Sequence, residues 1–418
     1  MDMAKPTIRF KGYQDDWEQR KLEDIAEFSK GSGYSKGDLI ESGTPIILYG
    51  RLYTKYETSI SEVDTYVEAK DGSVYSKGGE VIVPASGETA EDIARAATVD
   101  KSGVILGGDL NVVSPNEDIN SAFLAISISH GNSQRELAKK AQGKSVVHIH
   151  NEEIKNLVVP FSANAEQNKI VEYFSNLDHL ITLHQRKCDE TKRLKKYMLQ
   201  KMFPQNGEKV PEIRFSGFTD DWEQRKLGDI GKARSGVGFP DAEQGGVTGI
   251  PFFKVSDMNL GGNENEMTVA NNYVTAEQIA VHRWSPITEL PAIFFAKVGA
   301  AVMLNRKRLC RFPFLLDNNT MAYSLSSTKW DADFAKALFG TVDLTSLVQA
   351  GALPSYNAGD VESMEIYLPS LLEQEQIGGF FKQLDNLITL HQRKLEEMKK
   401  QKKALMQLLL TGIVRVKA

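Results

Sequence analysis

Two stretches of the chain carry apolar or packing residues at alternating spacings of four and three. They are Ile170, Phe174, Leu177, Ile181, His184 and Cys188 in the first, and Ile377, Phe381, Leu384, Ile388, His391, Leu395 and Met398 in the second. Such spacing, kept for three to four heptads, predicts long helices that pack along their length. Neither proline nor glycine interrupts residues 165–203 before Pro204. A helix over this stretch would be about 57 Å long, and the second helix is expected to end near Gly412.

The two stretches are near copies of each other, and a shorter block is repeated as well. Residues 8–25 read IRFKGYQDDWEQRKLEDI and residues 213–230 read IRFSGFTDDWEQRKLGDI, with 14 of 18 positions identical at an offset of 205. Residues 166–187 and 373–394 match at an offset of 207. Two long matches at nearly one offset indicate a tandem duplication.

The segments between the matched blocks have diverged. Residues 26–165 and 231–372 are 140 and 142 residues long but share little identity. Short β-rich runs such as 79–84 and 292–298, separated by Gly, Asn, Asp and Pro, predict irregular sheets in both. A conserved frame around diverged inserts favours a frame that sets geometry and inserts that set specificity. Simple drift of two copies is the alternative, but drift should also have eroded the frame.

We therefore expect an α+β fold in which two domains with irregular β-sheets alternate with two long antiparallel helices. These helices would form a coiled-coil spacer in an internal repeat with pseudo-two-fold symmetry. The expected parts are a first domain at 1–162, a helix at 163–204, a second domain at 205–370, and a helix with a C-terminal tail at 371–418. The same symmetry places the block 8–25 near the end of the second helix, so the N- and C-terminal segments should pack together.

The net charge is −5, from 50 basic and 55 acidic residues, and on that number alone a nucleic-acid partner is disfavoured. The charge is unevenly spread. Residues 166–202 hold 8 basic and 5 acidic residues and residues 373–418 hold 9 and 5, which leaves −12 for the rest of the chain. A solvated helix face is the usual explanation for such basic runs, and a surface for an acidic partner is the second.

Catalytic and metal-binding motifs are not found in the sequence. Residues 142–145 end like a phosphate-binding loop, but Ala138 stands where that loop needs glycine. The Pro-Pro pair of amino-methyltransferases is missing, and Asp241 lacks the acidic and lysine partners of a restriction-type nuclease. His148 and His150 could share a metal on one strand face, but no cysteine or carboxylate cluster joins them, so a structural role is favoured.

Composition also bears on the compartment. Cys188 and Cys310 are 122 positions apart, which fits neither a disulfide framework nor a zinc site. No apolar stretch is long enough to span a membrane, and no signal peptide is visible at the start. We expect a cytoplasmic protein with no membrane partner.

The repeated motifs carry a family resemblance over essentially the whole chain. The block Trp-Glu-Gln-Arg-Lys-Leu-x-Asp-Ile opens each domain, at 17–25 and 222–230, and each helix begins Glu-Gln-x-x-Ile and continues Leu-Asp-x-Leu-Ile. This order of motifs resembles the specificity subunit of type I restriction–modification systems. Residues 43–56 and 298–319 also look like target-recognition-domain sequence of that family.

The resemblance implies a non-catalytic, metal-free chain that recognises double-stranded DNA. Each target recognition domain would read one half of a bipartite, asymmetric site, while the helices fix the spacing and dock two methylation subunits. Restriction subunits would join the cleaving complex, and S-adenosylmethionine, ATP and Mg would belong to the partner subunits. An assembly scaffold that reads no DNA is the alternative.

Candidate residues follow from loops beside the expected strands and from the helix seam. For DNA contact they are Lys30, Tyr34, Lys36, Arg51, Tyr53 and Lys55 in the first insert, and Lys254, Arg306, Lys307, Arg308 and Arg311 in the second. For packing of the spacer helices they are Ile170, Phe174, Leu177, Ile181, Ile377, Phe381, Leu384 and Ile388. A solvated loop is the alternative for each DNA candidate.

Overall fold

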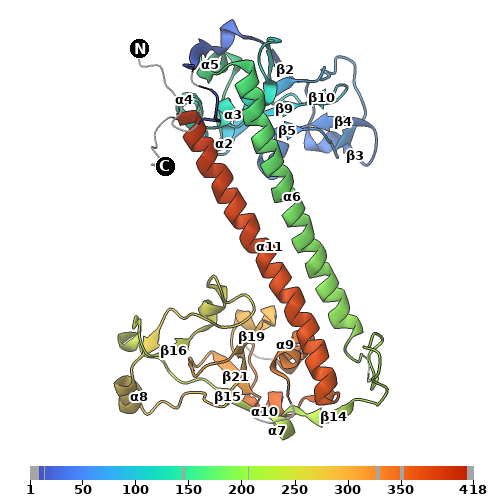
Figure 1. Cartoon of the computed structure of the whole chain (residues 1–418), viewed down its shortest axis with the longest axis vertical. Coiled ribbons are helices and arrows are strands. Elements are labelled where there is room, and N and C mark those ends of the chain that lie inside the picture. Colours follow the sequence, from blue (N-terminus) through green and yellow to red (C-terminus); the bar gives the residue numbers. More distant parts are fainter. Residues whose placement is uncertain are drawn as a thin grey trace. The chain divides into compact units, whose positions relative to one another are not determined.

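The computed structural model describes residues 9–13, 15–143, 146–205, 207–325, 330–348 and 353–411 (Figure 1). It divides into two compact units, Met1–His184 with Lys394–Ala418 (unit 1) and Gln185–Arg393 (unit 2). Two long helices, α6 (Asn164–Lys201) and α11 (Leu371–Thr411), each contribute one part to each unit. The expected α+β fold with two long helices and two domains with irregular sheets is confirmed.

Unit 1 contains two main sheets. The five-stranded sheet has the order β2 (Ala26–Lys30), β11 (Leu110–Pro115), β7 (Glu80–Pro84), β9 (Ala97–Val99) and β5 (Ser59–Ile60). The four-stranded sheet has the order β10 (Ile105–Leu106), β4 (Thr44–Ile47), β6 (Tyr66–Val67) and β3 (Leu39–Ile40). Every residue of the central strand β7 is buried, as expected for a strand that is covered on both faces.

Unit 2 repeats this order with fewer edge strands. Its four-stranded sheet runs β15 (Lys232–Ser235), β21 (Thr320–Ser324), β18 (Ala292–Ala296) and β19 (Lys307–Cys310). Its three-stranded sheet runs β17 (Tyr273–Val274), β16 (Ile250–Phe253) and β20 (Leu315–Leu316). In unit 1 β4 pairs in parallel with β10, and in unit 2 β16 pairs in parallel with β20. Two inserts with little sequence identity therefore share one topology.

A close backbone approach links the two sheets in each domain at matched glycines. A Cβ atom on Gly31 would lie 1.9 Å from the carbonyl oxygen of Gly107, and one on Gly236 would lie 1.8 Å from that of Asp317. Parallel bridges at the next residues, Ser32 to Gly107 and Val237 to Asp317, continue the contact. Only glycine fits where two backbones come this close, so the first glycine of the recurring Gly-x-Gly is a structural requirement of the domain, whereas a Cβ on the second, Gly33 or Gly238, would meet open space.

The remaining elements are short. In unit 1 they are β1 (Glu18–Lys21), η1 (Leu22–Asp24), η2 (Lys36–Asp38), α1 (Arg51–Thr54), β8 (Ser86–Gly87), α2 (Ala90–Ile93), α3 (Ser121–Ser129), α4 (Gly131–Lys140), β12 (Val147–His148), α5 (Asn151–Lys155) and β13 (Val158–Phe161). In unit 2 they are β14 (Glu223–Lys226), α7 (Leu227–Ile230), η3 (Asp241–Glu243), η4 (Val255–Asn259), α8 (Ala276–His282), η5 (Ala300–Leu304), α9 (Ala332–Thr341), η6 (Leu344–Leu347), α10 (Ala358–Glu362) and β22 (Glu365–Leu368).

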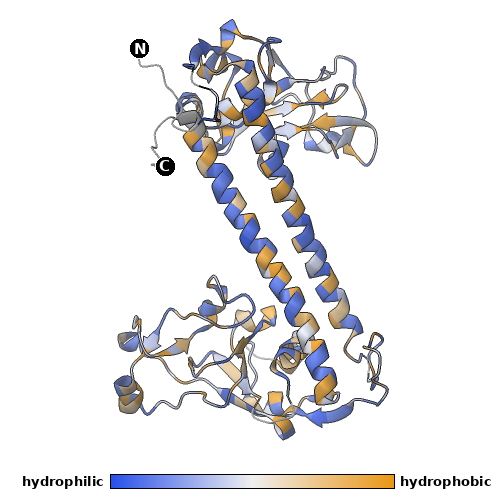
Figure 2. Ribbon diagram, in the orientation of Figure 1, coloured by the Kyte–Doolittle hydropathy of each residue, from blue (hydrophilic) through white to orange (hydrophobic). Residues whose placement is uncertain are grey.

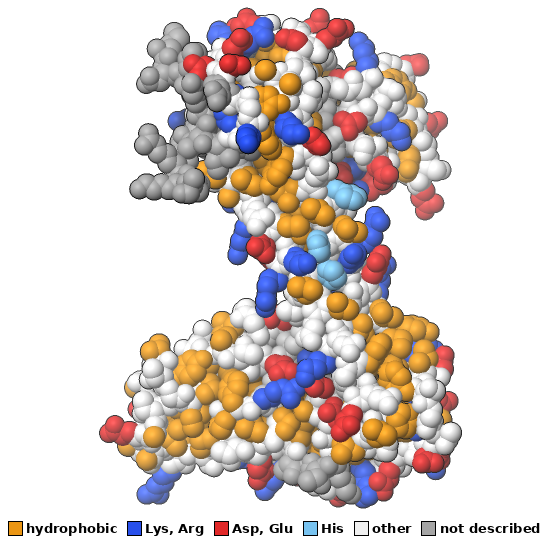
Figure 3. Space-filling view, in the orientation of Figure 1, with side chains coloured by type: hydrophobic (Ala, Val, Ile, Leu, Met, Phe, Trp, Pro, Cys, Tyr) orange, Lys and Arg blue, Asp and Glu red, His pale blue; other side chains and the backbone are white. Residues whose placement is uncertain are grey.

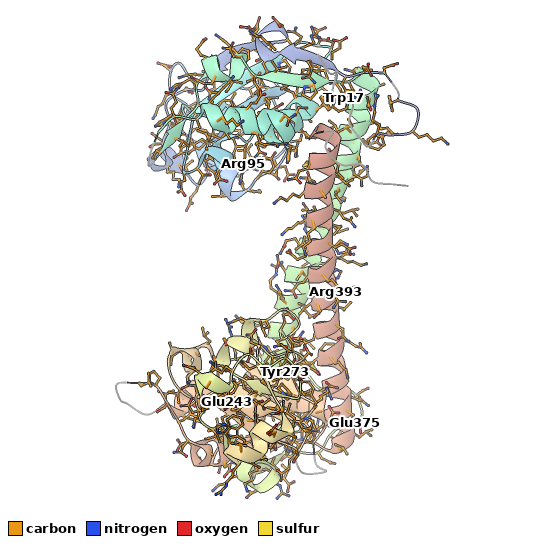
Figure 4. The ribbon with its side chains drawn as sticks, turned by 90° about the vertical axis from the view of Figure 1, so that its left-hand side faces the viewer. Trp17, Arg95, Glu243, Tyr273, Glu375 and Arg393 are labelled. Atoms are coloured by element: carbon orange, nitrogen blue, oxygen red, sulfur yellow. The ribbon has the colours of Figure 1, made fainter. Side chains whose placement is uncertain are left out.

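The repeated block is held against the start of each long helix by a buried ion pair. Arg9 donates to the carboxylate of Glu166 from Nε at 2.8 Å and from Nη2 at 2.6 Å, and Arg214 does the same to Glu373 at 2.6 and 2.8 Å. Both carboxylates are 1% exposed. Trp17, labelled in Figure 4, also donates to Glu166, at 3.0 Å. The glutamate of the Glu-Gln motif thus joins the repeated block to the helix.

The glutamine of the same motif holds a helix of the domain. Gln167 accepts a hydrogen bond from the backbone N–H of Asn120, whose side chain caps α3. Gln374 accepts one from the N–H of Asp331, whose side chain caps α9. A capping residue that is itself held fixes both the position and the direction of the helix it starts. This explains why both residues of the motif are repeated.

The core of each unit takes residues from both long helices. In unit 1 the cluster around Trp17 and Phe123 includes Ile170 and Phe174 of α6 and Met406 of α11. The expected packing of the first repeated block against the end of the second helix is therefore confirmed for the described residues, while Ile8 and Ala418 lie outside them. In unit 2 the corresponding cluster includes three residues of α11 (Ile377, Phe381 and Leu384) and Met202 and Phe203, which directly follow α6, and Met198 and Leu199 of α6 pack against it. Apolar and polar bands alternate along both helices in Figure 2.

Within each unit the helices run antiparallel and are joined by one matched ion pair. Lys402 of α11 lies 2.5 Å from Asp178 of α6 in unit 1, and Lys195 of α6 lies 2.5 Å from Asp385 of α11 in unit 2. The two pairs correspond through the repeat, because Lys402 lies 207 positions after Lys195 and Asp385 lies 207 positions after Asp178. Part of each basic run therefore neutralises the neighbouring helix.

Candidate nucleic-acid interface

The first candidate loop of unit 1 is organised around Tyr34. Its hydroxyl lies 2.5 Å from Oγ of Ser73 and accepts a hydrogen bond from the backbone N–H of Lys70 at 2.8 Å. The ammonium of Lys70 lies 4.7 Å from the Tyr34 ring centroid and 2.5 Å from Asp38. Lys30, at the end of β2, and Lys36, in η2, are exposed nearby along the chain. Both can reach an external anion.

The second candidate loop is tied to its own domain. Arg51, with a side chain 8% exposed, donates to Asp64 at 2.7 Å and to Glu57 at 2.8 Å. Lys55 also reaches Asp64, at 3.1 Å. Tyr53 donates to the carbonyl of Ser86 at 2.7 Å, and burial raises its pKa. A shielded guanidinium with two carboxylate partners has little positive charge left for DNA, so these residues fix the shape of the loop.

The basic cluster of unit 2 lies in and next to β19, and its side chains mostly contact other residues of the same unit. Arg308 donates to the carbonyl of Asn263 at 2.6 Å, and the ammonium of Lys307 donates to that of Val342. Burial lowers the pKa of Lys307 to about 8. Arg311 is held by Glu266 at 3.0 Å and by Asp333 at 2.6 Å.

Two candidates of unit 2 have neutral partners. Arg306 is exposed and donates to the side chain of Asn259 at 2.7 Å, and half-buried Lys254 donates to Gln244 at 3.1 Å. A cation whose partner is an amide keeps its charge for a phosphate. As DNA contacts, all eleven candidates remain predictions.

The seam candidates lie at the buried side of the helices. Seven of them are buried: Ile170, Phe174, Leu177, Ile377, Phe381, Leu384 and Ile388. Ile181 is half-buried. The first residues of each seam, Ile170 and Ile377, belong to the core of a recognition domain as well as to a helix, because each helix begins against its domain. Their role in helix-to-helix packing stays a prediction.

A groove in unit 1 escaped the sequence analysis. It encloses about 1470 Å³ and is lined by Arg95, by Arg135 of α4, and by Lys399 and Lys403 of α11. His130 also lines it, and burial lowers the pKa of this histidine to about 4, so its ring is neutral at neutral pH. The four cations come from segments far apart in sequence. The one signal of it in the sequence is the matched lysine run of the helices, for which a solvated face is the usual explanation.

Other motifs singled out in the sequence have ordinary surroundings. The rings of His148 and His150 stack at 6.5 Å, and Nδ1 of His148 lies 3.1 Å from Oγ of Ser86. Among the described residues no group of three or more His, Cys, Asp or Glu could hold a metal ion. Both cysteines are free and buried. Lys144 and Ser145, which end the loop at 142–145, lie outside the described residues.

Comparison with known families decides the relationship of the chain. A family described as the type I restriction modification DNA specificity domain matches it twice, over residues 14–193 and 219–400. The chain belongs to this family. Each match begins in a repeated block and extends into a long helix, so one specificity domain corresponds to one copy of the internal repeat. No helix within the described part of the chain is long and apolar enough to cross a membrane.

Relatives of this specificity chain are similar over nearly their full length. The type I restriction enzyme MjaVIII specificity subunit of Methanocaldococcus jannaschii is 22% identical, covering 96% of this chain and 94% of the relative. The putative MjaX specificity subunit of the same organism is 26% identical, covering 96% and 95%. The chain is thus a specificity subunit of a type I restriction–modification system by family and by length.

Solved structures show the same fold. The crystal structure of the S subunit of a type I restriction–modification system from M. genitalium has a TM-score of 0.63 at 14% identity, covering 98% of this chain and all of the other. A chain from a structure on complex assembly and conformational transition of the type I system has a TM-score of 0.56 at 14% identity, covering 95% and 98%.

Proposed function

We propose that this specificity subunit reads DNA, with each recognition domain reading one half of a bipartite, asymmetric site. One observation carries the proposal: two domains with the same strand order are joined to their helices through the same Glu-Gln motif, yet their loops differ in sequence. A shared scaffold gives both domains the same way to approach a duplex. Different loop side chains give them different bases to recognise, because sequence is read at base edges and by DNA shape, while phosphate contacts set the register.

The long helices fix the distance between the two half-sites in this proposal. Two readers on one duplex must contact the same face, about one helical turn or ~34 Å apart. A continuous helix is a suitable spacer because its length is set by its residue number. In α6 no proline or glycine breaks the helix between Asn164 and Lys201.

The helices also dock the methylation subunits. Large apolar side chains are exposed on them: Tyr173 and Leu180 in unit 1, and Leu194, Tyr197, Leu387 and Leu390 in unit 2. Figure 3 shows apolar side chains in orange beside basic ones in blue on the helical segments. Exposed apolar residues that cluster mark sites of protein association. Leu180 and Leu387 are repeat equivalents, which fits two copies of one partner.

Chemistry belongs to the partners in this scheme. Methyl transfer with S-adenosylmethionine would be carried out by the methylation subunits. Restriction subunits with ATP and Mg would join for cleavage, in the cytoplasm where the DNA lies. The chain itself supplies recognition and assembly, without catalytic residues of its own.

A domain exchange tests the proposal. Replacing residues 26–165 with the corresponding insert of another family member should change one half-site and leave the other unchanged, as read by methylated-base sequencing in cells that contain the methylation subunit. Exchange of residues 231–372 is the matched control and should change only the other half-site. The scaffold alternative predicts the same methylated sequence in all three strains, and that outcome would reject DNA reading.

A further inference from the structure

The groove of unit 1 differs from the other charged surfaces described above because all the charged residues that line it are basic. Four cations face it, and among the described residues that line it none is acidic. Arg135 donates from Nε to the carbonyl of Gly131 at 3.3 Å, which leaves its other two nitrogens directed elsewhere. Arg95, labelled in Figure 4, is paired with Asp92 at 2.5 Å, and Lys399 lies 4.0 Å from Glu396. Arg135 and Lys403 therefore hold most of the uncompensated charge.

The matched lysines of unit 2 provide an internal comparison. Lys192 and Lys196 are the repeat equivalents of Lys399 and Lys403, and they line a smaller groove of about 370 Å³. Two carboxylates of the chain, Glu264 and Asp385, share that lining. The matched lysines thus share a groove with acidic groups of their own unit in unit 2 and line a basic groove in unit 1. In unit 1 α4, which follows α3, supplies Arg135 to the groove, whereas the described element that follows α9 in unit 2 is the short η6.

We propose that the unit 1 groove binds the phosphate backbone of duplex DNA, through Arg135 and Lys403 with support from Arg95 and Lys399. This inference rests on the proposed function for its ligand and deepens it by naming the phosphate-binding site. The groove is larger than the usual pocket for a small molecule, and neutral hydrogen-bond donors such as Gln134 also line it. Both features suit a row of phosphates.

The charge distribution of the chain supports DNA over an acidic protein. Outside the helices the chain carries −12, so its capacity to neutralise phosphates must be concentrated at a few places. The loop candidate Arg51 is already paired with Glu57 and Asp64. A groove that combines helix lysines with domain arginines supplies what the loops of unit 1 lack. This groove sets the register of the protein on the duplex without reading the base sequence, as phosphate contacts do.

The test uses the full chain and a fluorescent duplex of about 30 base pairs with arbitrary sequence, because phosphate contacts do not depend on sequence. Affinity is measured by anisotropy over a range of salt concentrations. The double variant Arg135→Gln with Lys403→Gln should lower the slope of log K against log salt by about 1.8, which is roughly a 60-fold loss at about 0.1 M salt. The charge-conserving variant Arg135→Lys with Lys403→Arg should keep the slope.

The matched control is Lys192→Gln with Lys196→Gln, which removes the same charge from the equivalent positions and should change the slope far less. An equal drop in both Gln variants, or no drop in the first, overturns the proposal. So does loss of a co-purifying methylation subunit at unchanged DNA affinity, which would assign the groove to an acidic protein. Methylated-base sequencing separates the groove proposal from the proposed reading of half-sites. A reduced salt slope with an unchanged methylated sequence concerns phosphate binding by the groove and not the reading of sequence.

Discussion

The two units begin from one frame and differ in how their domains are tied to it. Glu166 of unit 1 accepts hydrogen bonds from both Arg9 and Trp17, whereas Glu373 accepts from Arg214, and the buried Nε1 of Trp222 has no partner among the described residues. The repeated block is nearly identical in sequence at both places. Identical residues therefore do not guarantee identical hydrogen bonds.

The second difference lies where the helices meet the domains. In unit 2, Asp385 binds Lys336 of α9 at 2.8 Å as well as Lys195, and Asp333 binds Lys382 at 2.9 Å. In unit 1, Asp178 binds Lys402, and the neighbouring face of α11 lines the basic groove. Two ion pairs between α9 and α11 therefore tie the second domain to the helix. In unit 1, basic side chains of α11 line the groove instead and are left available to a ligand.

The largest expected effect comes from the buried carboxylates. Glu166→Gln and Glu373→Gln should each destabilise their own unit by roughly 3 kcal/mol, because the amide removes the charge opposite a shielded arginine. The loss of stability should be larger for Glu166, because its replacement also weakens the hydrogen bond that Trp17 donates to this carboxylate. Urea unfolding followed by hydrogen exchange on peptides of each unit measures this. Glu172→Gln, at an exposed site on α6, is the control and should cost under about 0.5 kcal/mol; equal small losses at all three sites would refute the comparison.

The inter-helix aspartates should rank next. Asp385→Asn leaves two lysines facing a site whose carboxylate is 8% exposed, so we expect a loss of about 2 kcal/mol in unit 2. Asp178→Asn affects one lysine at a carboxylate that is 35% exposed, and the loss should stay below about 1 kcal/mol. The same unfolding measurement applies. The reverse ranking would show that the second lysine contributes nothing.

The smallest difference concerns the matched tryptophans. Trp17→Phe removes a hydrogen bond to a buried carboxylate, whereas Trp222→Phe removes a donor that has no partner among the described residues. Both changes lose similar apolar contact, so Trp17→Phe should be the more destabilising by roughly 1.5 kcal/mol. Two equal free energies of unfolding would mean that Trp222 finds a partner in solution.

The repeat made much of the fold predictable, and the reasons lie in particular residues. Long helices with an uninterrupted seam can be recognised because each turn adds the same signal, as from Ile170 to Ile181. The contact of the first block with the end of α11 followed from symmetry alone. The bounds of the short strands did not, because two-residue strands such as β5 and β10 depend on partners far along the chain.

The candidate site was harder to predict, for an electrostatic reason. A sequence shows that Arg51 and Arg311 are basic, but not that Glu57 and Asp333 fold back onto them. Arg135 and Lys403 are 268 positions apart, and only the packing of α4 near α11 puts them in one groove. The Gly-x-Gly at 31–33 and 236–238 could have been found, because it recurs at the offset of the first block.

The burial of Met406 in the core of unit 1 has a consequence for the order of folding. Synthesis runs from the N-terminus, yet the N-terminal unit needs a side chain that is made after all of unit 2. Unit 2 is built from one continuous stretch, Gln185–Arg393, and all of its residues leave the ribosome before residue 406 does. Domains generally fold as their residues emerge, so the unit whose synthesis begins first is completed only after unit 2. Its core remains open to solvent until residue 406 has left the ribosome.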